Sequence, residues 1–290
     1  MQRHGKLKQL LSAMALASGL AALPACVSTS PDARLAAVLV QVEQAGWLAM
    51  PLPTSQFTLM AFGRPAPHAH PVLRVYIEGD GFAWVDPYTP SFDPTPSKAL
   101  ALTLAQLDPA PAVVYLGRPC QYVRGLARQG CDDNRWWTSH RFAPAVMQST
   151  HAALDTLKQR YQASQLELVG YSGGGTVAAV VAAQRNDVRR LVTVAGNLDP
   201  ATWTRMNRLS PMVAMQNPAD MTEQLAHLPQ LHFVGRDDHV IPPAISQSYV
   251  QRFAEGNKPQ VRMLEGFNHH CCWAQAWPSL LQEAFPATSP

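Results

Sequence analysis

Residues 170–174 constrain the possible folds of this chain more than any other segment. They read G-x-S-x-G, with Ser172 at the centre. The apolar run at 166–169 predicts a buried strand before them, and the small and apolar residues at 176–183 predict a helix after them. A serine between such a strand and helix lies on a sharp turn, where a Cβ at either glycine would collide with backbone. The pattern therefore predicts a strand–turn–helix unit that exposes the Ser172 hydroxyl.

Strands and helices alternate along most of the chain. Apolar and β-branched runs predict further strands at 57–62, 72–77, 112–116, 191–195, 231–234 and 261–264. Helical spacing of apolar residues predicts helices at 31–45, 98–107 and 145–161. Such alternation is typical of a mostly parallel central sheet with helices on both faces.

Two later strands each end in a glycine followed by residues that can complete a catalytic site. The strand at 231–234 leads through Gly235 to Asp237 and Asp238, and the strand at 261–264 leads through Gly266 to His269 and His270. The order along the chain is therefore serine, aspartate, histidine, which is the α/β-hydrolase order and not that of two other well-known serine hydrolase classes. By these three motifs the chain resembles the α/β-hydrolases, and more narrowly the bacterial α/β-hydrolase lipoproteins, over residues 55–285.

The resemblance assigns a role to each of these side chains. Ser172 is the expected nucleophile, and it needs a base because a free hydroxyl is a poor nucleophile. His269, three residues after Gly266, is the expected base, with His270 as the alternative. Asp238 matches the family's spacing for the acid that orients the histidine, with Asp237 as the alternative.

The resemblance also implies an oxyanion hole, which needs N–H donors aimed at the developing negative charge. The backbone N–H groups of Gly173 and Asp80 are the expected donors. Many relatives have His-Gly in the loop that carries the second donor, whereas this chain has Glu-Gly-Asp-Gly at 78–81. Glu78 and Asp80 are expected either to point away and brace the loop or to select a cationic or hydroxylated substrate.

These motifs predict a serine hydrolase that cleaves an ester, thioester or amide through an acyl-enzyme, with carboxylesterase or lipase-like activity as the main expectation. The expected substrate is a small-molecule or lipid acyl compound, and the expected enzyme is a monomer without metal or cofactor. The alternatives are an acyltransferase with the same triad and a non-catalytic envelope protein that binds a partner or an acyl ligand. The hydrolase domain is expected at 55–290, with 197–229 forming either a small cap or an irregular connection.

The N-terminus has the pattern of a bacterial lipoprotein signal peptide at residues 1–25. Three cations, Arg3, Lys6 and Lys8, precede a short apolar stretch, and Leu-Pro-Ala-Cys ends it at Cys26. Cys26 is the expected lipidation site; the alternative is ordinary signal cleavage beside a coincidental cysteine. Residues 26–54 then form a lipidated tether and an N-terminal helix. The resemblance implies a lipid anchor on the periplasmic face of the outer membrane.

Removing this signal segment leaves no excess of positive charge. The full chain has 23 Lys and Arg against 20 Asp and Glu, and the segment at 1–25 contains three of the cations and no acid. Twenty cations against 20 anions remain. Nucleic-acid binding needs a clustered basic surface, so nucleic acid is not an expected partner.

Four cysteines remain after lipidation of Cys26, and in an oxidising compartment an even number suggests disulfides. In an α/β-hydrolase sheet, the strands that precede the two cysteine pairs would lie on opposite sides of the nucleophile strand. The resemblance therefore favours a local disulfide between Cys120 and Cys131. Cys271 and Cys272 would then be free thiols or a vicinal disulfide.

Overall fold

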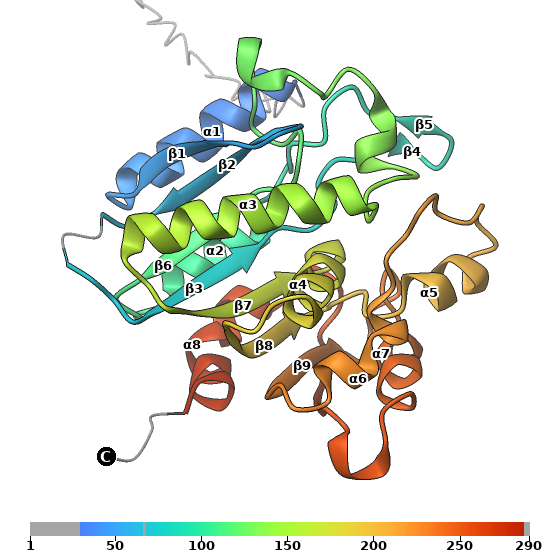
Figure 1. The fold of residues 1–290 in the computed structure, drawn as a ribbon. Coiled ribbons are helices and arrows are strands. Elements are labelled where there is room, and N and C mark those ends of the chain that lie inside the picture. Colours follow the sequence, from blue (N-terminus) through green and yellow to red (C-terminus); the bar gives the residue numbers. More distant parts are fainter. Residues whose placement is uncertain (1–29, 66–67, 287–290) are drawn as a thin grey trace, which may run out of the picture.

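The structure, a computed structural model, describes residues 30–65 and 68–286. Its centre is an eight-stranded sheet with the order β1-β2-β6-β3-β7-β8-β9-β10 (Figure 1). β1 pairs with β2, and β2 with β6, in antiparallel fashion, and all other neighbours in this sheet are parallel. Its strands are β1 (Leu48–Pro53), β2 (Thr58–Gly63), β3 (Val72–Ile77), β6 (Val113–Leu116), β7 (Gln165–Tyr171), β8 (Val188–Val194), β9 (Gln230–Gly235) and β10 (Gln260–Leu264).

A separate hairpin and a set of helices complete the described part of the chain. The hairpin pairs β4 (Trp84–Asp86) with β5 (Thr89–Pro90). The α-helices are α1 (Pro31–Gln44), α2 (Leu100–Leu107), α3 (Pro144–Tyr161), α4 (Gly173–Ala183), α5 (Pro200–Met206), α6 (Thr222–Leu225), α7 (Pro243–Val250) and α8 (Trp273–Ala284), and the 3-10 helices are η1 (Gly125–Arg128), η2 (Asn134–Trp137), η3 (Pro218–Asp220) and η4 (Glu255–Asn257). Within residues 30–65 and 68–286, none of the helices has the length and apolar character needed to cross a membrane.

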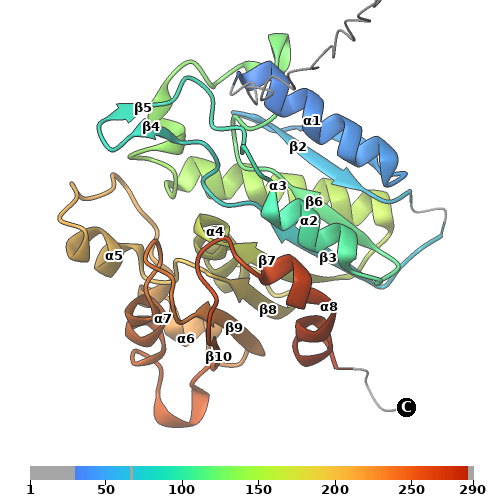
Figure 2. The same ribbon diagram turned by 180° about the vertical axis from the view of Figure 1, so that it is seen from behind.

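Helices cover both faces of the sheet because its central strands are apolar on both sides. In β3, Leu73 and Val75 pack into the core beneath α3 and α4, whereas Tyr76 packs into the opposite core with α2 and α8. Figure 1 shows α3 and α4 in front of the sheet, and Figure 2 shows α1, α2 and α8 on the other face. The predicted mostly parallel sheet with helices on both faces is confirmed.

The parallel register brings the loops that matter to one edge of the sheet. Ile77, the last residue of β3, lies opposite Leu116 of β6 and Gly170 of β7. The carboxyl ends of these strands therefore meet at the same edge. The loop at 78–81 and the serine turn after β7 leave the sheet side by side.

The folded unit extends further toward the N-terminus than the predicted boundary at residue 55. β1 pairs with β2 over its whole length, and α1 buries Val38 and Val42 against the core. The stretch assigned to the tether and N-terminal helix therefore contributes a helix and a strand to the domain from residue 31 onward. The predicted signal segment at 1–25 and Cys26 lie outside the described residues.

Candidate active site

Ser172 lies on the turn that joins β7 to α4, with φ 52° and ψ −123°. In this backbone region a residue other than glycine is strained, and it keeps this conformation only where the surrounding structure enforces it. A Cβ at Gly170 would lie 2.5 Å from the carbonyl oxygen of Gly174, and a Cβ at Gly174 would lie 2.3 Å from that of Ile77. The two glycines therefore permit the close packing of strand, turn and helix. The strand–turn–helix geometry expected from the G-x-S-x-G pattern is present.

A continuous hydrogen-bonded chain joins Ser172, His269 and Asp238. The His269 Nε2 atom lies 3.0 Å from the Ser172 Oγ atom, and its Nδ1 atom lies 2.8 Å from Asp238 Oδ2. Asp238 is buried, and its other oxygen accepts hydrogen bonds of 2.8 Å from the N–H groups of Val240 and Ile241. A carboxylate held in this way keeps the proton of the imidazole on Nδ1. Nε2 is then free to accept the serine proton.

The two alternative residues lie elsewhere. The His270 Nδ1 atom lies 3.0 Å from the Tyr171 hydroxyl, and its side chain contacts neither Ser172 nor Asp238 through a hydrogen bond. Burial, together with the electrostatic effects of His269 and Lys98, lowers the pKa of His270. Asp237 is exposed in the turn after β9. The structure thus brings the expected base and acid to the serine and leaves both alternatives outside the hydrogen-bonded chain.

Tyr171 supports the loop that carries His269, a role that was not predicted from the sequence. Its hydroxyl donates to the carbonyl oxygen of His269 at 3.1 Å, and its ring centre lies 5.3 Å from that of the imidazole. Because Tyr171 directly precedes Ser172, the same strand end positions the serine and the histidine.

The loop at 78–81 packs directly against the serine turn. A Cβ at Gly79 would lie 3.1 Å from the Ser172 Cβ atom. The Gly79 carbonyl oxygen accepts a 3.0 Å hydrogen bond from the side-chain amide of Gln121. In a trans peptide the C=O and N–H groups point in opposite directions, so the Asp80 N–H points away from Gln121. The Gly173 N–H lies in the first turn of α4, where the helix supplies no acceptor. The Gly173 N–H therefore lies at the serine turn without a helical acceptor, and the Asp80 N–H lies in the adjacent loop and is directed away from Gln121.

The Asp80 carboxylate lies between two buried arginines. Its oxygens are 3.3 Å from Arg118 Nη1 and 3.0 Å from Arg141 Nε. A Cβ at Gly173 would lie 2.1 Å from Asp80 Oδ1, so the carboxylate lies over the start of α4. Paired with two guanidinium groups, this carboxylate braces the loop, and its charge is balanced close to the place where an oxyanion would form. Arg141 is distant in sequence from the loop that it supports, so this role could not be predicted from the sequence.

Glu78 is buried behind the same loop. Its carboxylate accepts hydrogen bonds from the Gly79 N–H at 2.8 Å and from the Tyr115 hydroxyl at 3.2 Å. The Tyr115 hydroxyl in turn lies 2.8 Å from the Tyr122 hydroxyl. Burial raises the pKa of Glu78 from 4.5 to about 7. Like Asp80, Glu78 braces the loop.

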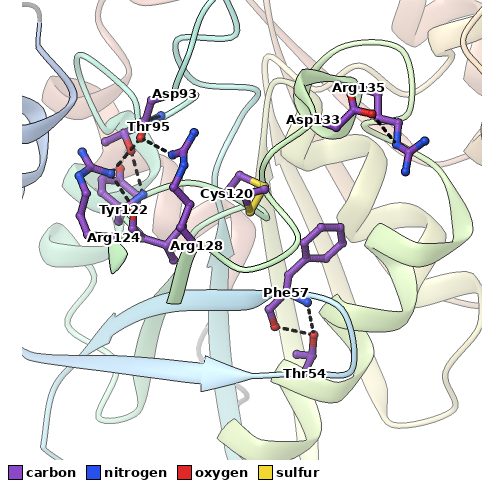
Figure 3. The surroundings of a disulfide bond; sticks show 12 residues. Thr54, Phe57, Asp93, Thr95, Cys120, Tyr122, Arg124, Arg128, Asp133 and Arg135 are labelled. Carbon is purple, nitrogen blue, oxygen red and sulfur yellow. Dashed lines mark hydrogen bonds and ion pairs between the residues drawn. A yellow bond between two sulfur atoms is a disulfide. The ribbon is translucent and has the colours of Figure 1, made fainter. Parts of the chain in front are cut away.

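A disulfide between Cys120 and Cys131 closes the loop that carries Gln121, as the resemblance implied. Arg124 and Arg128 in this loop both bind the buried carboxylate of Asp93 (Figure 3). The disulfide and these ion pairs fix the segment from which Gln121 reaches the Gly79 carbonyl. Of the two states expected for the other cysteines, the structure has the vicinal disulfide, between Cys271 and Cys272.

A pocket of about 520 Å³ opens above the serine. Ser172, His269 and Asp80 line it, and none of the residues 197–229, expected to form either a small cap or an irregular connection, does so. Within residues 30–65 and 68–286, no cluster of three or more His, Cys, Asp or Glu side chains is placed to hold a metal ion. The remaining lining residues are Glu78, Gly79, Gly81, Phe82, Pro96, Ser97, Lys98, Tyr171, Val240 and His270.

Comparisons with known proteins agree with this architecture. The family model described as alpha/beta hydrolase fold matches residues 129–234, which include the serine turn. Solved structures of α/β-hydrolases superpose on most of the chain. The chain has the α/β-hydrolase fold. No curated protein sequence matches this chain.

Three of these solved structures show the extent of the likeness. Est1E from Butyrivibrio proteoclasticus has a TM-score of 0.54 at 13% identity, over 81% of this chain and 98% of its own. An alpha-beta serine hydrolase homologue from Coxiella burnetii has a TM-score of 0.55 at 17% identity, over 82% and 95%. XC6422 from Xanthomonas campestris, described as a serine hydrolase without lid, has a TM-score of 0.53 at 15% identity, over 84% and 97%. At these identities the likeness establishes the fold.

Proposed function

We propose that the protein is a serine hydrolase that cleaves a carboxylic ester through an acyl-enzyme formed on Ser172. The observation that carries this proposal is the unbroken chain from the Ser172 hydroxyl through His269 to Asp238, with distances of 3.0 and 2.8 Å. A nucleophile within hydrogen-bond reach of a base, which is itself oriented by a third group, is the signature of an activated serine.

The reaction proceeds in two halves. As the Ser172 oxygen attacks the carbonyl carbon, His269 Nε2 takes the serine proton, and Asp238 stabilises the resulting imidazolium. The N–H groups of Gly173 and Asp80 donate to the oxyanion of the tetrahedral intermediate. His269 then gives its proton to the leaving oxygen, and the acyl group remains on Ser172. Water, deprotonated by the same histidine, attacks the acyl-enzyme and releases the acid.

The ion pairs behind Asp80 support this mechanism. A free carboxylate beside the oxyanion would oppose the charge that develops there. Arg118 and Arg141 offset that charge, so the Asp80 backbone can serve as a donor while its side chain fixes the loop. The hydrogen bond from Gln121 to Gly79 sets the orientation of the peptide that carries this donor.

The solved relatives support a carboxylic acid derivative as the substrate class, and one of them, Pf2001 from Pyrococcus furiosus, is described as an esterase, at a TM-score of 0.57 and 12% identity. Est1E has been solved with ferulic acid bound, at a TM-score of 0.57 and 14% identity. A Mycobacterium tuberculosis relative is described as a puromycin-hydrolyzing peptidase, at a TM-score of 0.60 and 15% identity. Thioesters and amides use the same attack on a carbonyl carbon, so they belong in the substrate panel beside esters.

A fluorophosphonate probe tests the nucleophile without knowledge of the substrate. The probe should label the wild-type protein and should not label Ser172→Ala. Ser97→Ala is the matched control, because Ser97 is a second serine in the wall of the same pocket, and it should label normally. Labelling that persists in Ser172→Ala, or that disappears in Ser97→Ala alone, contradicts the assignment.

The N-terminal pattern adds a location to this proposal. We propose that Cys26 is lipidated and anchors the enzyme on the periplasmic face of the outer membrane. The support is the cationic and apolar segment at 1–25 that ends in Leu-Pro-Ala-Cys. A clickable fatty acid fed to expressing bacteria should label the wild-type chain and not Cys26→Ala. Equal labelling of both chains would contradict the anchor.

A further inference from the structure

The four most exposed large apolar side chains of residues 30–65 and 68–286 lie in two short segments. Leu126, in η1, is 97% exposed, Tyr88 and Phe92 are 91% exposed, and Val85 is 58% exposed. Single apolar side chains are common on protein surfaces, but a group of strongly exposed ones often marks an interaction site. We call these four residues the docking surface.

The buried carboxylate of Asp93 holds the two segments together. Arg128 is in the same 3-10 helix as Leu126. Its Nη1 atom lies 3.1 Å from the Asp93 carboxylate, and its Nη2 atom donates at 2.7 Å to the Phe92 carbonyl oxygen. Arg124 approaches the same carboxylate at 2.9 Å (Figure 3). Because a disulfide also closes the loop that contains η1, the exposed apolar side chains extend from a fixed base.

The N-terminal end of α1 meets these segments at the same place. The Arg124 Nε atom lies 2.7 Å from the carboxylate of Asp32, in the first turn of α1. The Arg34 guanidinium donates at 2.9 Å to the carbonyl oxygen of Asp93. Figure 1 shows η1 beside this end of α1. The chain therefore enters the folded domain next to the docking surface.

Only a short stretch of chain separates this point from the proposed lipid anchor. Pro31, the first residue of α1, follows Cys26 by five residues. A fully extended chain advances at most about 3.6 Å per residue, so these residues reach about 18 Å. A lipid on Cys26 would hold the N-terminal end of α1 within that reach of the bilayer, with the docking surface beside it.

We propose that the docking surface inserts into the lipid bilayer to which Cys26 anchors the chain. This proposal rests on the lipid anchor that forms part of the proposed function. Insertion moves exposed aromatic and aliphatic side chains from water to the boundary between lipid headgroups and acyl chains, while the arginines beneath them stay paired with Asp93. The anchor keeps the surface at a high local concentration near lipid, so insertion of a few side chains suffices.

Docking also attaches the bilayer to a segment that continues into the serine pocket. Phe82 and Pro96 both line the pocket that contains Ser172. The residues between them include the β4–β5 hairpin and Phe92. This part of the docking surface therefore begins and ends at the wall of the pocket, and insertion holds that wall in a defined orientation to the membrane.

Quenching of tryptophan fluorescence by brominated lipids tests the insertion. The mature lipidated protein is reconstituted in vesicles of phosphatidylethanolamine and phosphatidylglycerol, with and without bromine on the acyl chains. Phe92→Trp and Leu126→Trp each place an indole on the docking surface. Val261→Trp is the matched control, because Val261 is an exposed apolar residue of β10, at the opposite edge of the sheet from β1.

The expected result is quenching confined to the docking surface. The fluorescence that Phe92→Trp or Leu126→Trp adds to the wild-type signal should fall about twofold or more in brominated vesicles, because an indole inserted about 5–10 Å comes close to the acyl chains. The fluorescence that Val261→Trp adds should be the same in both kinds of vesicle.

A charge on the docking surface supplies a second variant. Leu126→Asp, added to Phe92→Trp, should remove most of the quenching, because a carboxylate must leave water to enter the bilayer. Leu107→Asp, at an exposed position at the end of α2, is the matched control and should leave the quenching unchanged.

Three outcomes would overturn the proposal: no quenching of Phe92→Trp and Leu126→Trp, equal quenching of Val261→Trp, and quenching of Phe92→Trp that persists with Leu126→Asp. A fluorescence change that follows the protein-to-lipid ratio and not bromination would also overturn it, by showing that a second copy of the chain covers the surface. Clickable fatty acid on Cys26 and fluorophosphonate labelling of Ser172 in the same samples separate these outcomes from a failure of the proposed function.

Discussion

Replacing Glu78 by glutamine isolates the effect of one buried charge in the loop at 78–81. Glu78 is 1% exposed, and its carboxylate accepts hydrogen bonds from the Gly79 N–H and the Tyr115 hydroxyl. No cation lies within ion-pair distance of it in the described part of the chain. Burial therefore dominates and raises its pKa from 4.5 to about 7.

The sign and size of the effect follow from this pKa. Between pH 4.5 and about 7 the folded protein holds a proton that the unfolded chain has released. The stability associated with this proton is fully present below pH 4.5 and is lost as the pH rises through the folded-state pKa. At 1.36 kcal/mol per pH unit, the loss amounts to about 3 kcal/mol. Glutamine has nearly the same shape and carries no charge, so Glu78→Gln should not show this loss.

Urea unfolding of both proteins at pH 4.5 and pH 8 measures the difference. The free energy of unfolding of Glu78→Gln minus that of wild type should be about 3 kcal/mol larger at pH 8 than at pH 4.5, so the variant gains stability relative to wild type as the pH rises. Because the two proteins share all other titratable groups, the contribution of those groups to the pH dependence cancels in the difference. Glu43→Gln, at an exposed position on α1, should show no such change. If Glu78→Gln differs from wild type by the same amount at both pH values, burial does not raise this pKa.

Three further predictions concern the two histidines, the hydrogen bond from Gln121 to the loop at 78–81, and the disulfide between Cys120 and Cys131. His269→Ala should lower kcat by about a thousandfold or more, whereas His270→Ala, which changes only local packing, should lower it less than about tenfold; steady-state kinetics giving the reverse order would move the catalytic role to His270. Gln121→Leu removes the donor to the Gly79 carbonyl, so kcat should fall about tenfold with little change in KM; a higher KM at unchanged kcat would show that Gln121 acts on substrate binding instead. Cys120→Ala opens the loop closed by the disulfide and should lower the free energy of unfolding by about 3 kcal/mol, as measured in urea; a Cys120 thiol that alkylates freely in the non-reduced wild type would contradict the disulfide.

Much of the local structure could be predicted from the sequence. The turn at Ser172 follows from Gly170 and Gly174, because only residues without a Cβ allow the helix to pack so close to the strand. The predicted strand at 72–77 matches β3, and the predicted helix at 145–161 matches α3 to within one residue. The antiparallel strand β1 was missed, because its two prolines disfavour a strand assignment.

The ion pairs that hold the loop at 78–81 could not be predicted in the same way. Asp80 was expected at the oxyanion hole, and its acidic side chain made that expectation hard to reconcile with a negative intermediate. Arg118 and Arg141 resolve this conflict, yet they come from different loops and meet Asp80 only in the folded chain. No spacing pattern in the sequence links these three residues.

The sequence by itself determined the sharp turn at Ser172, the chain order of Ser172, Asp238 and His269, and the alternation of strands and helices. Each of these depends on neighbouring residues, through glycine backbone geometry or the periodicity of apolar side chains. The tertiary structure alone decided that His269 and not His270 reaches Ser172, that Glu78 is buried, and that Arg118 and Arg141 pair with Asp80. These features depend on how distant loops meet at the edge of the sheet, and the free energy of burying or pairing a charge is set by that packing.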